Sequence, residues 1–221
     1  MCWLDRACSR TILQLRDRFG VEALVETGTA EGNSAIFYSR HFRDVYSCEA
    51  DPALYELAQK RSRHLNNVHI SHRRSPVFLR SFKTWGAIFF LDAHSPGDWP
   101  IWEELEALGG NSRCCIVVHD FKVPVPGLGY LKDGNLELDL DYIREPLMAV
   151  NPGFHLYHNL GGDIVTPEEA EKGVGVPWDE HTEKVLEYAW SSPEKTQRGI
   201  LYAVPEPLAE DELGLRAWTW R

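Results

Sequence analysis

The 221-residue sequence has no long hydrophobic run and no excess of positive charge, and both absences restrict its possible functions. A membrane-spanning helix needs about 20 apolar residues, and no stretch approaches that length. Residues 1–14 mix charged and isolated apolar side chains, unlike a secretion signal. The sequence has 33 Asp and Glu against 23 Lys and Arg, so its formal net charge is −10. We therefore expect a protein that binds neither membranes nor nucleic acid.

Cysteine is sparse, and its spacing matches neither a disulfide framework nor a zinc site. None of the five cysteines forms a CxxC pair (Cys2, Cys8, Cys48, Cys114 and Cys115). The last three fall in predicted buried strands, where cysteine behaves as a small hydrophobic residue. The sequence therefore predicts free thiols in a reducing compartment, and hence a cytoplasmic protein.

What the sequence does contain is an alternation of short apolar runs with amphipathic segments. Apolar positions at helical spacing over residues 1–20 end at Gly20 and predict an N-terminal helix. Predicted strands then cover residues 23–26, 45–49, 68–72, 87–91, 114–118, 154–158 and 199–204. Predicted helices cover residues 33–42, 52–65, 76–81, 102–108 and 140–150. This order predicts one doubly wound α/β domain over residues 1–221, with a mostly parallel seven-stranded sheet and helices on both faces.

Two segments exceed what such a domain requires. Residues 122–135 are rich in proline and glycine and follow the fifth predicted strand. A loop of that length in a compact domain is usually functional or disordered. Residues 166–192 are acidic, contain short helical patterns and precede the last predicted strand. We interpret this second segment as an insertion or a lid.

The segment from Glu26 to Ser34 (ETGTAEGNS) follows a predicted strand and opens a predicted helix. In that context Gly28 permits a tight turn, and Gly32 permits close approach of the helix and a ligand. Glycines at these places also occur for packing alone. About 20 residues further on, Glu49 ends the next strand, where a carboxylate can accept hydrogen bonds from both ribose hydroxyls of a nucleoside. Asp51 precedes Pro52 and is expected to cap a helix.

Acidic and histidine side chains follow the fourth and fifth predicted strands. They are Asp92, His94, His119 and Asp120. Neighbouring strand ends bring such groups to one cleft, where they can hold a divalent ion or remove a proton from an acceptor hydroxyl. A purely structural role remains open for each of them, as a loop hydrogen bond or a buried histidine.

With these motifs the chain resembles the class I SAM-dependent methyltransferases. It is similar, more narrowly, to the small O-methyltransferases of the macrocin and catechol type. The resemblance covers residues 21–125 and rests on Glu26–Asn33, Cys48–Pro52, Leu91–His94 and Val118–Phe121. The glycine pattern also lacks the GxGxxG that accommodates a dinucleotide pyrophosphate, which argues against a nicotinamide-dependent reductase.

The resemblance implies a Rossmann-like methyltransferase fold and transfer of a methyl group from SAM to an oxygen, less readily a nitrogen, of a small-molecule acceptor. The implied SAM-binding residues are Glu26, Gly28, Thr29, Gly32, Asn33, Ser34, Glu49, Arg74, Ser75 and Asp92. The implied catalytic residues are His94, His119 and Asp92. Metal-dependent relatives bind magnesium through acids at two strand ends, which correspond to Asp92 and Asp120. Because His119 and Phe121 flank the second acid, the third ligand is an imidazole or absent.

The sequence is compatible with two other functions. A SAM-binding or interaction protein without catalysis is favoured by the irregular His119-Asp120-Phe121 sequence. A nucleic-acid methyltransferase would use the basic run over residues 61–83, but the net charge argues against it. The C-terminal Trp218 and Trp220 are expected to pack against the sheet or against a partner subunit in a homodimer.

Overall fold

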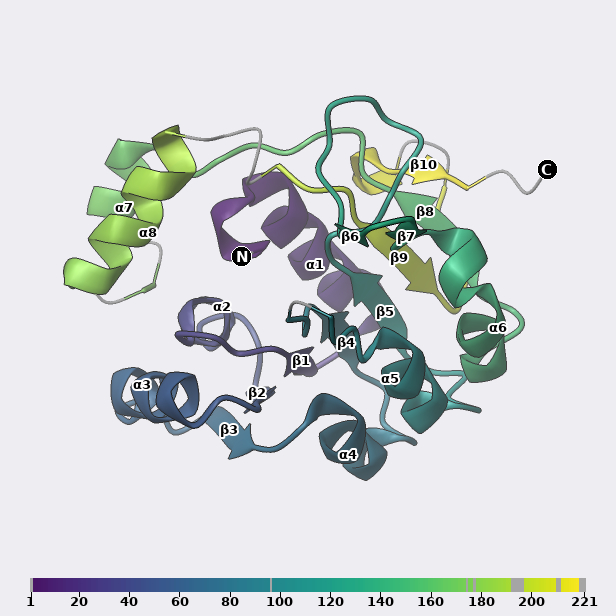
Figure 1. Cartoon of the computed structure of the whole chain (residues 1–221), viewed down its shortest axis with the longest axis horizontal. Helices are drawn as coiled ribbons and strands as arrows, with labels where there is room; N and C mark the ends of the chain where they lie inside the picture. The colour runs from purple at the N-terminus through teal and green to yellow at the C-terminus, as the bar shows by residue number, and fades with distance from the viewer. Residues whose placement is uncertain are drawn as a thin grey trace.

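The computed structural model describes residues 2–95, 97–173, 175–176, 178–191, 197–209 and 212–218. Its centre is an eight-stranded sheet with the strand order β10-β8-β9-β5-β4-β1-β2-β3 (Figure 1). The strands are β1 (Ala23–Thr27), β2 (Asp44–Glu49), β3 (Val68–His72), β4 (Ile88–Leu91), β5 (Cys115–Val118), β8 (His155–His158), β9 (Leu201–Val204) and β10 (Arg216–Ala217).

Strands β1 to β5 run parallel to one another, and β9 pairs antiparallel with both β5 and β8. The helices are α1 (Arg6–Phe19), α2 (Asn33–Tyr38), α3 (Pro52–Ser62), α4 (Ser75–Leu79), α5 (Ile101–Leu108), α6 (Leu140–Val150), α7 (Pro167–Glu171) and α8 (Glu180–Ser191). Short 3-10 turns lie at η1 (Cys2–Leu4), η2 (Arg80–Phe82) and η3 (Glu212–Gly214). The predicted mostly parallel α/β fold is therefore confirmed.

The sheet has an apolar core on each face because successive strand residues point to opposite sides. Phe89 of β4 packs in the core that α4, α5 and α6 cover. Its neighbour Phe90 packs in the core that α1 and α2 cover. Both rings are completely buried, and burial of one such side chain contributes about 3 kcal/mol. The continuous apolar runs of β4 and β5 therefore follow from the presence of helices on both faces.

The number of strands exceeds the prediction of seven. The additional strand β10 pairs with β8 over two residues. A second, two-stranded sheet joins β6 (Lys132–Asp133) to β7 (Leu136–Glu137), and β6 lies within the segment predicted to be a loop. Strands of two residues are too short to produce a period-2 pattern in the sequence.

The prediction of free thiols holds for some cysteines and is wrong for Cys8. Cys48, Cys114 and Cys115 are free and buried. Cys8, in contrast, is disulfide-bonded. Spacing alone gave no sign of this bond, because Cys8 belongs to no recognisable disulfide pattern.

The acidic segment 166–192 forms α7 and α8, which stand beside the start of α1 and away from α6 (Figure 1). Val185, Leu186 and Ala189 of α8 share a separate apolar cluster with Trp3 and Leu4. The described part of this segment is therefore packed on the N-terminal residues. No helix among the described residues is both long and apolar enough to cross a membrane.

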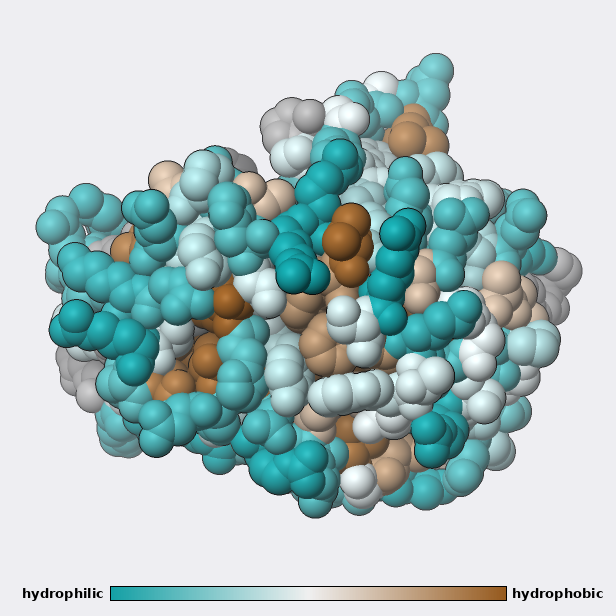
Figure 2. Space-filling view, turned by 90° about the horizontal axis from the view of Figure 1, so that it is seen from below, coloured by the Kyte–Doolittle hydropathy of each residue, from teal (hydrophilic) through white to brown (hydrophobic). Residues whose placement is uncertain are grey.

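The face that carries α3, β3 and α4 is mainly hydrophilic, with hydrophobic residues in small separate areas (Figure 2). Part of the basic run predicted from the sequence lies on these elements. Arg63 and Arg73 are exposed, but Arg61 of α3 is buried. The run is therefore not one uniform basic surface.

Candidate active site

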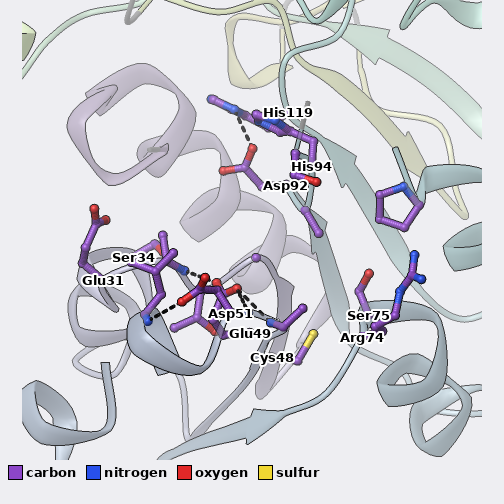
Figure 3. A pocket seen from close by; sticks show the side chains of 18 of the residues that line it. Glu31, Ser34, Cys48, Glu49, Asp51, Arg74, Ser75, Asp92, His94 and His119 are labelled. Carbon is purple, nitrogen blue, oxygen red and sulfur yellow. Dashed lines mark hydrogen bonds and ion pairs between the residues drawn. The ribbon is translucent and has the colours of Figure 1, made fainter. Parts of the chain in front are cut away.

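A cavity of about 900 Å³ lies where β1, β2, β4 and β5 end. Ligands of open α/β sheets bind at this carboxyl edge of the strands. Three groups stand out among the side chains labelled in Figure 3: Ser34 with Glu49 and Asp51, Arg74 with Ser75, and Asp92 with His94 and His119. Sequence-predicted residues in the wall are Gly28, Thr29, Asn33, Ser34, Glu49, Arg74, Ser75, Asp92, His94, His119 and Asp120.

The backbone conformation of the loop after β1 requires a glycine at position 28. Its φ is +78°, and a Cβ at this position would lie 2.9 Å from both Ala93 Cα and Asp92 O. The amides of Gly28 and Thr29 both donate to the Cys48 carbonyl, at 3.1 and 3.0 Å. The loop thus runs directly over the end of β4, and a side chain at residue 28 would push the two apart.

Gly32 and Glu26 are not among the described residues that line the cavity. Gly32 has a φ of +82°, and a Cβ there would lie 3.2 Å from the Ala58 Cβ of α3. Its small size therefore serves the packing of α2 against α3. Glu26 is buried and accepts hydrogen bonds from the Ser34 hydroxyl and, at 2.7 Å, from the Ser47 hydroxyl. Burial raises the pKa of Glu26 to about 7.

Glu49 presents its carboxylate at the cavity wall in a fixed orientation. One oxygen accepts from the Ala30 amide at 2.8 Å, and the other accepts from the Ala50 and Asp51 amides at 2.8 and 2.9 Å. Since two carboxylate oxygens have about four acceptor positions, capacity for further donors remains. Asp51 caps α3 by accepting from the Ala53 and Leu54 amides at 2.8 and 3.0 Å, as predicted.

Arg74 and Ser75 form the opposite side of the cavity at the start of α4. Ser75 is buried, whereas Arg74 is exposed and pairs with Asp98 at 3.0 Å. Asp98 also lines the cavity, although the sequence analysis gave it no role. Because the Arg74 pair is exposed, its contribution to stability is small.

The side chains after β4 and β5 form a connected cluster, as their positions at adjacent strand ends predicted. Asp92 Oδ1 lies 3.0 Å from His119 Nδ1, and Asp120 Oδ2 lies 3.0 Å from His94 Nε2. His119 Nδ1 is also 3.3 Å from Asp120 Oδ1. His119 is buried, whereas 37% of the His94 side chain is exposed. Among these groups, His94 is therefore the imidazole that a ligand can reach.

The charges of this cluster shift the pKa values of its members. Burial raises the pKa of Asp120, but His119, His94 and Arg198 outweigh that effect and hold it well below its ordinary value. Burial likewise raises the pKa of Asp92, and the charge of His119 reverses the direction. The hydrogen bond to Asp120 raises the pKa of His94 against the opposing effect of burial. Both acids are therefore ionised at neutral pH.

Arg198 is a cluster member that the sequence analysis missed. Its Nε donates to Asp120 Oδ1, across 78 positions of the chain. Asp120 has a φ of +57°, which is uncommon for a residue with a side chain. Arg198 lines the cavity and belongs to no motif, so only the fold brings it to the site. Tyr188 of α8 is a further residue of the cavity wall that the sequence analysis missed.

Three side chains of the cluster fit a divalent ion. One ligand atom each from Asp92, His94 and Asp120 lies within 4.8 Å of the others. Two carboxylate oxygens and one imidazole form a mixed donor set, whereas magnesium prefers oxygen ligands alone. His119 and Arg198 would then be the outer hydrogen-bond partners that orient the two carboxylates.

No protein family model matches the sequence, and no curated protein matches it either. Solved structures do match. An O-methyltransferase from Bacillus cereus in complex with SAH aligns with a TM-score of 0.55 and 15% identity, over 91% of this chain and 81% of that one. A Klebsiella pneumoniae protein, whose assignment as an O-methyltransferase is provisional, aligns with a TM-score of 0.51 and 16% identity, over 89% and 79%.

The chain has the methyltransferase fold. The same fold also occurs in spermidine synthase from Thermotoga maritima, which aligns with a TM-score of 0.50 and 12% identity. That alignment covers 92% of this chain but only 58% of the synthase. The comparisons thus confirm the predicted Rossmann-like fold, while enzymes of different names share it.

Proposed function

We propose that the protein transfers a methyl group from SAM to an oxygen of a small-molecule acceptor, with a nitrogen as the alternative acceptor atom. The observation that carries this proposal is the composition of one cavity. One cavity contains the glycine loop after β1, the oriented Glu49 carboxylate at the end of β2, and the acid–histidine cluster at the ends of β4 and β5. A nucleoside cofactor and a proton acceptor can therefore lie side by side.

In this proposal, different cavity residues contact the adenine, the ribose and the methionine parts of SAM. Arg74 and Ser75 lie at the adenine edge, and Glu49 accepts hydrogen bonds from the ribose hydroxyls. Thr29, Asn33 and Ser34 line the part near the methionine group, where Gly28 leaves the necessary space. Glu26 and Gly32 contribute indirectly, through Ser34 and through the packing of α2 on α3.

When bound, SAM supplies a methyl group that is already activated by its sulfonium, so the protein has to position the acceptor and remove its proton. His94 is the side chain best placed for that removal. A neutral His94 that donates Nε2–H to Asp120 keeps Nδ1 as a proton acceptor. Asp92 holds His119 in the same way from the other side. A divalent ion at Asp92, His94 and Asp120 would instead polarise the acceptor hydroxyl.

The test is a calorimetric titration of the purified protein with SAM in EDTA, repeated with magnesium and with manganese. We expect saturable binding of one SAM per chain in EDTA, because none of the proposed SAM contacts requires a metal. A further heat on adding the metal, absent in Asp120→Asn, would support the ion site. Lack of SAM binding in all three buffers would refute the proposal. Binding without methyl transfer to any of a broad set of acceptors would favour a SAM-binding protein without catalysis.

A further inference from the structure

One aromatic side chain in the cavity wall comes from outside the sheet and its loops. Tyr188 lies near the end of α8, within the acidic segment that the minimal fold does not need. It is the one described residue of 166–191 that lines the cavity, and 49% of it is exposed. Because an exposed aromatic ring has a large apolar surface, burying it against a bound molecule contributes favourably to the free energy of binding.

A buried arginine fixes the first turn of α8 to the glycine loop. Arg61 of α3 is only 8% exposed, and Nη1 donates to the Glu31 carbonyl at 2.8 Å and to Asn33 Oδ1 at 2.6 Å. Toward α8, Nε donates to Asp179 Oδ2 at 3.1 Å, and Nη2 donates to Thr182 Oγ1 at 2.8 Å. One planar guanidinium therefore joins two residues of the cavity wall to the start of α8.

The far end of α8 is fixed independently. The Trp190 indole donates to the Val165 carbonyl at 2.7 Å, and the Val165 amide donates to the Leu4 carbonyl at 2.9 Å. Between the two attachments, Tyr188 follows Thr182 by six residues, about 9 Å along a helix. Tyr188 therefore lies between two fixed points of α8, in the wall of the same cavity that Glu31 and Asn33 line.

We propose that Tyr188 contacts the ligand at the glycine-loop end of the cavity and that Arg61 is its positioning residue. This inference rests on the proposed function, because it takes SAM and its product SAH as the ligands. Arg61 holds the start of α8 through Asp179 and Thr182, while Trp190 holds its far end. We therefore expect a change at Arg61 to loosen the position of the Tyr188 ring without releasing α8. Lysine cannot replace it, since one ammonium group cannot reach four acceptors in two directions.

The experiment is calorimetric titration of the full chain with SAH. We expect Tyr188→Ala to weaken SAH binding about 5–10-fold and Tyr188→Phe to leave it within 2-fold, because the ring and not the hydroxyl makes the contact. Trp178→Ala is the matched control, since Trp178 is 54% exposed in the same segment and does not line the cavity. We expect wild-type affinity for that variant. If wild type binds SAH and Tyr188→Ala binds it equally well, the inference is wrong and the proposed function stands.

A double-mutant cycle separates positioning from a general structural role. We expect Arg61→Lys to weaken SAH binding about 5-fold in the wild-type background and less than 2-fold in the Tyr188→Ala background. Equal losses in both backgrounds would show that Arg61 does not act through Tyr188. Thermal unfolding of each variant identifies any loss of fold. If wild type itself fails to bind SAH, the proposed function fails together with this inference.

Discussion

The two ends of the cavity are built in different ways. At the glycine-loop end, Gly28, Thr29 and Ser34 belong to one segment, and Glu49 follows on the adjacent strand. At the cluster end, Asp120 is held by Arg198, a residue 78 positions away that lies beyond the acidic segment. The first end is therefore encoded in a short motif, whereas the second depends on how distant parts of the chain pack.

This difference predicts that the two ends respond differently to mutation. Backbone geometry determines the loop end, so small steric changes there should abolish ligand binding. Balanced charges determine the cluster end, so a substitution there should alter stability and chemistry while leaving SAM in place.

Gly28→Val should weaken SAM binding more than 100-fold, or about 3 kcal/mol. The new Cβ would lie 2.9 Å from backbone atoms of Asp92 and Ala93, and a β-branched residue at φ +78° is strained. Calorimetry with SAM measures the loss, and thermal unfolding shows whether the variant folds. Gly161→Ala is the control, because no atom lies within 4 Å of its added Cβ. Wild-type affinity in Gly28→Val would contradict the placement of SAM over this loop. If Gly28→Val does not fold, Gly28→Ala is the milder variant for the same measurement.

The sequence was sufficient for the glycine-loop end because its signals are local. Glu49 and the Asp51 cap follow from strand–turn–helix rules that act over a few residues. The proximity of Asp92 and Asp120 could also be predicted from the sequence, since each follows one of two neighbouring parallel strands. Arg198 and Tyr188 could not be predicted, because no periodic pattern specifies where α8 and the segment before β9 pack. For Gly32, a pattern compatible with ligand approach proved to reflect the packing of α2 against Ala58.

Two buried glutamates, Glu26 and Glu104, differ in their hydrogen bonds. Glu26 has two serine hydroxyl donors, whereas Glu104 of α5 has both oxygens buried without a well-formed hydrogen bond among the described residues. Burial raises the pKa of Glu104 to about 7. Between its ordinary pKa of 4.5 and that value, the folded protein binds a proton that the unfolded chain has lost. Stability should therefore fall as the pH rises through this range.

Glu104→Gln should raise the free energy of unfolding by about 3 kcal/mol at pH 8 and leave it nearly unchanged at pH 4.5. A neutral amide keeps the shape of the side chain and needs no proton to be buried. Urea unfolding of both proteins across this pH range measures the difference, and the contribution of Glu26 cancels because both proteins retain it. A difference that does not change with pH would show that Glu104 is not protonated in the folded protein.

Arg198→Met tests the cluster end directly. Removing the guanidinium leaves the Asp120 carboxylate, whose side chain is 8% exposed, with less positive charge around it. We expect a loss of about 2 kcal/mol in the free energy of unfolding, because 23% of the Arg198 side chain is exposed and solvent screens part of the pair. SAM affinity should stay within 2-fold of wild type, since Arg198 touches the cluster and not the loop.

The matched control for this last variant is Arg43→Met. Arg43 pairs with Glu22 and Asp44, but 66% of its side chain is exposed, so we expect its removal to leave the free energy of unfolding unchanged within error. If Arg198→Met behaves like Arg43→Met in urea, Asp120 does not depend on Arg198. If instead Arg198→Met abolishes SAM binding, the two ends of the cavity are coupled. The two ends of the cavity would then be specified by separate parts of the sequence, but they would not contribute independently to the free energy of SAM binding.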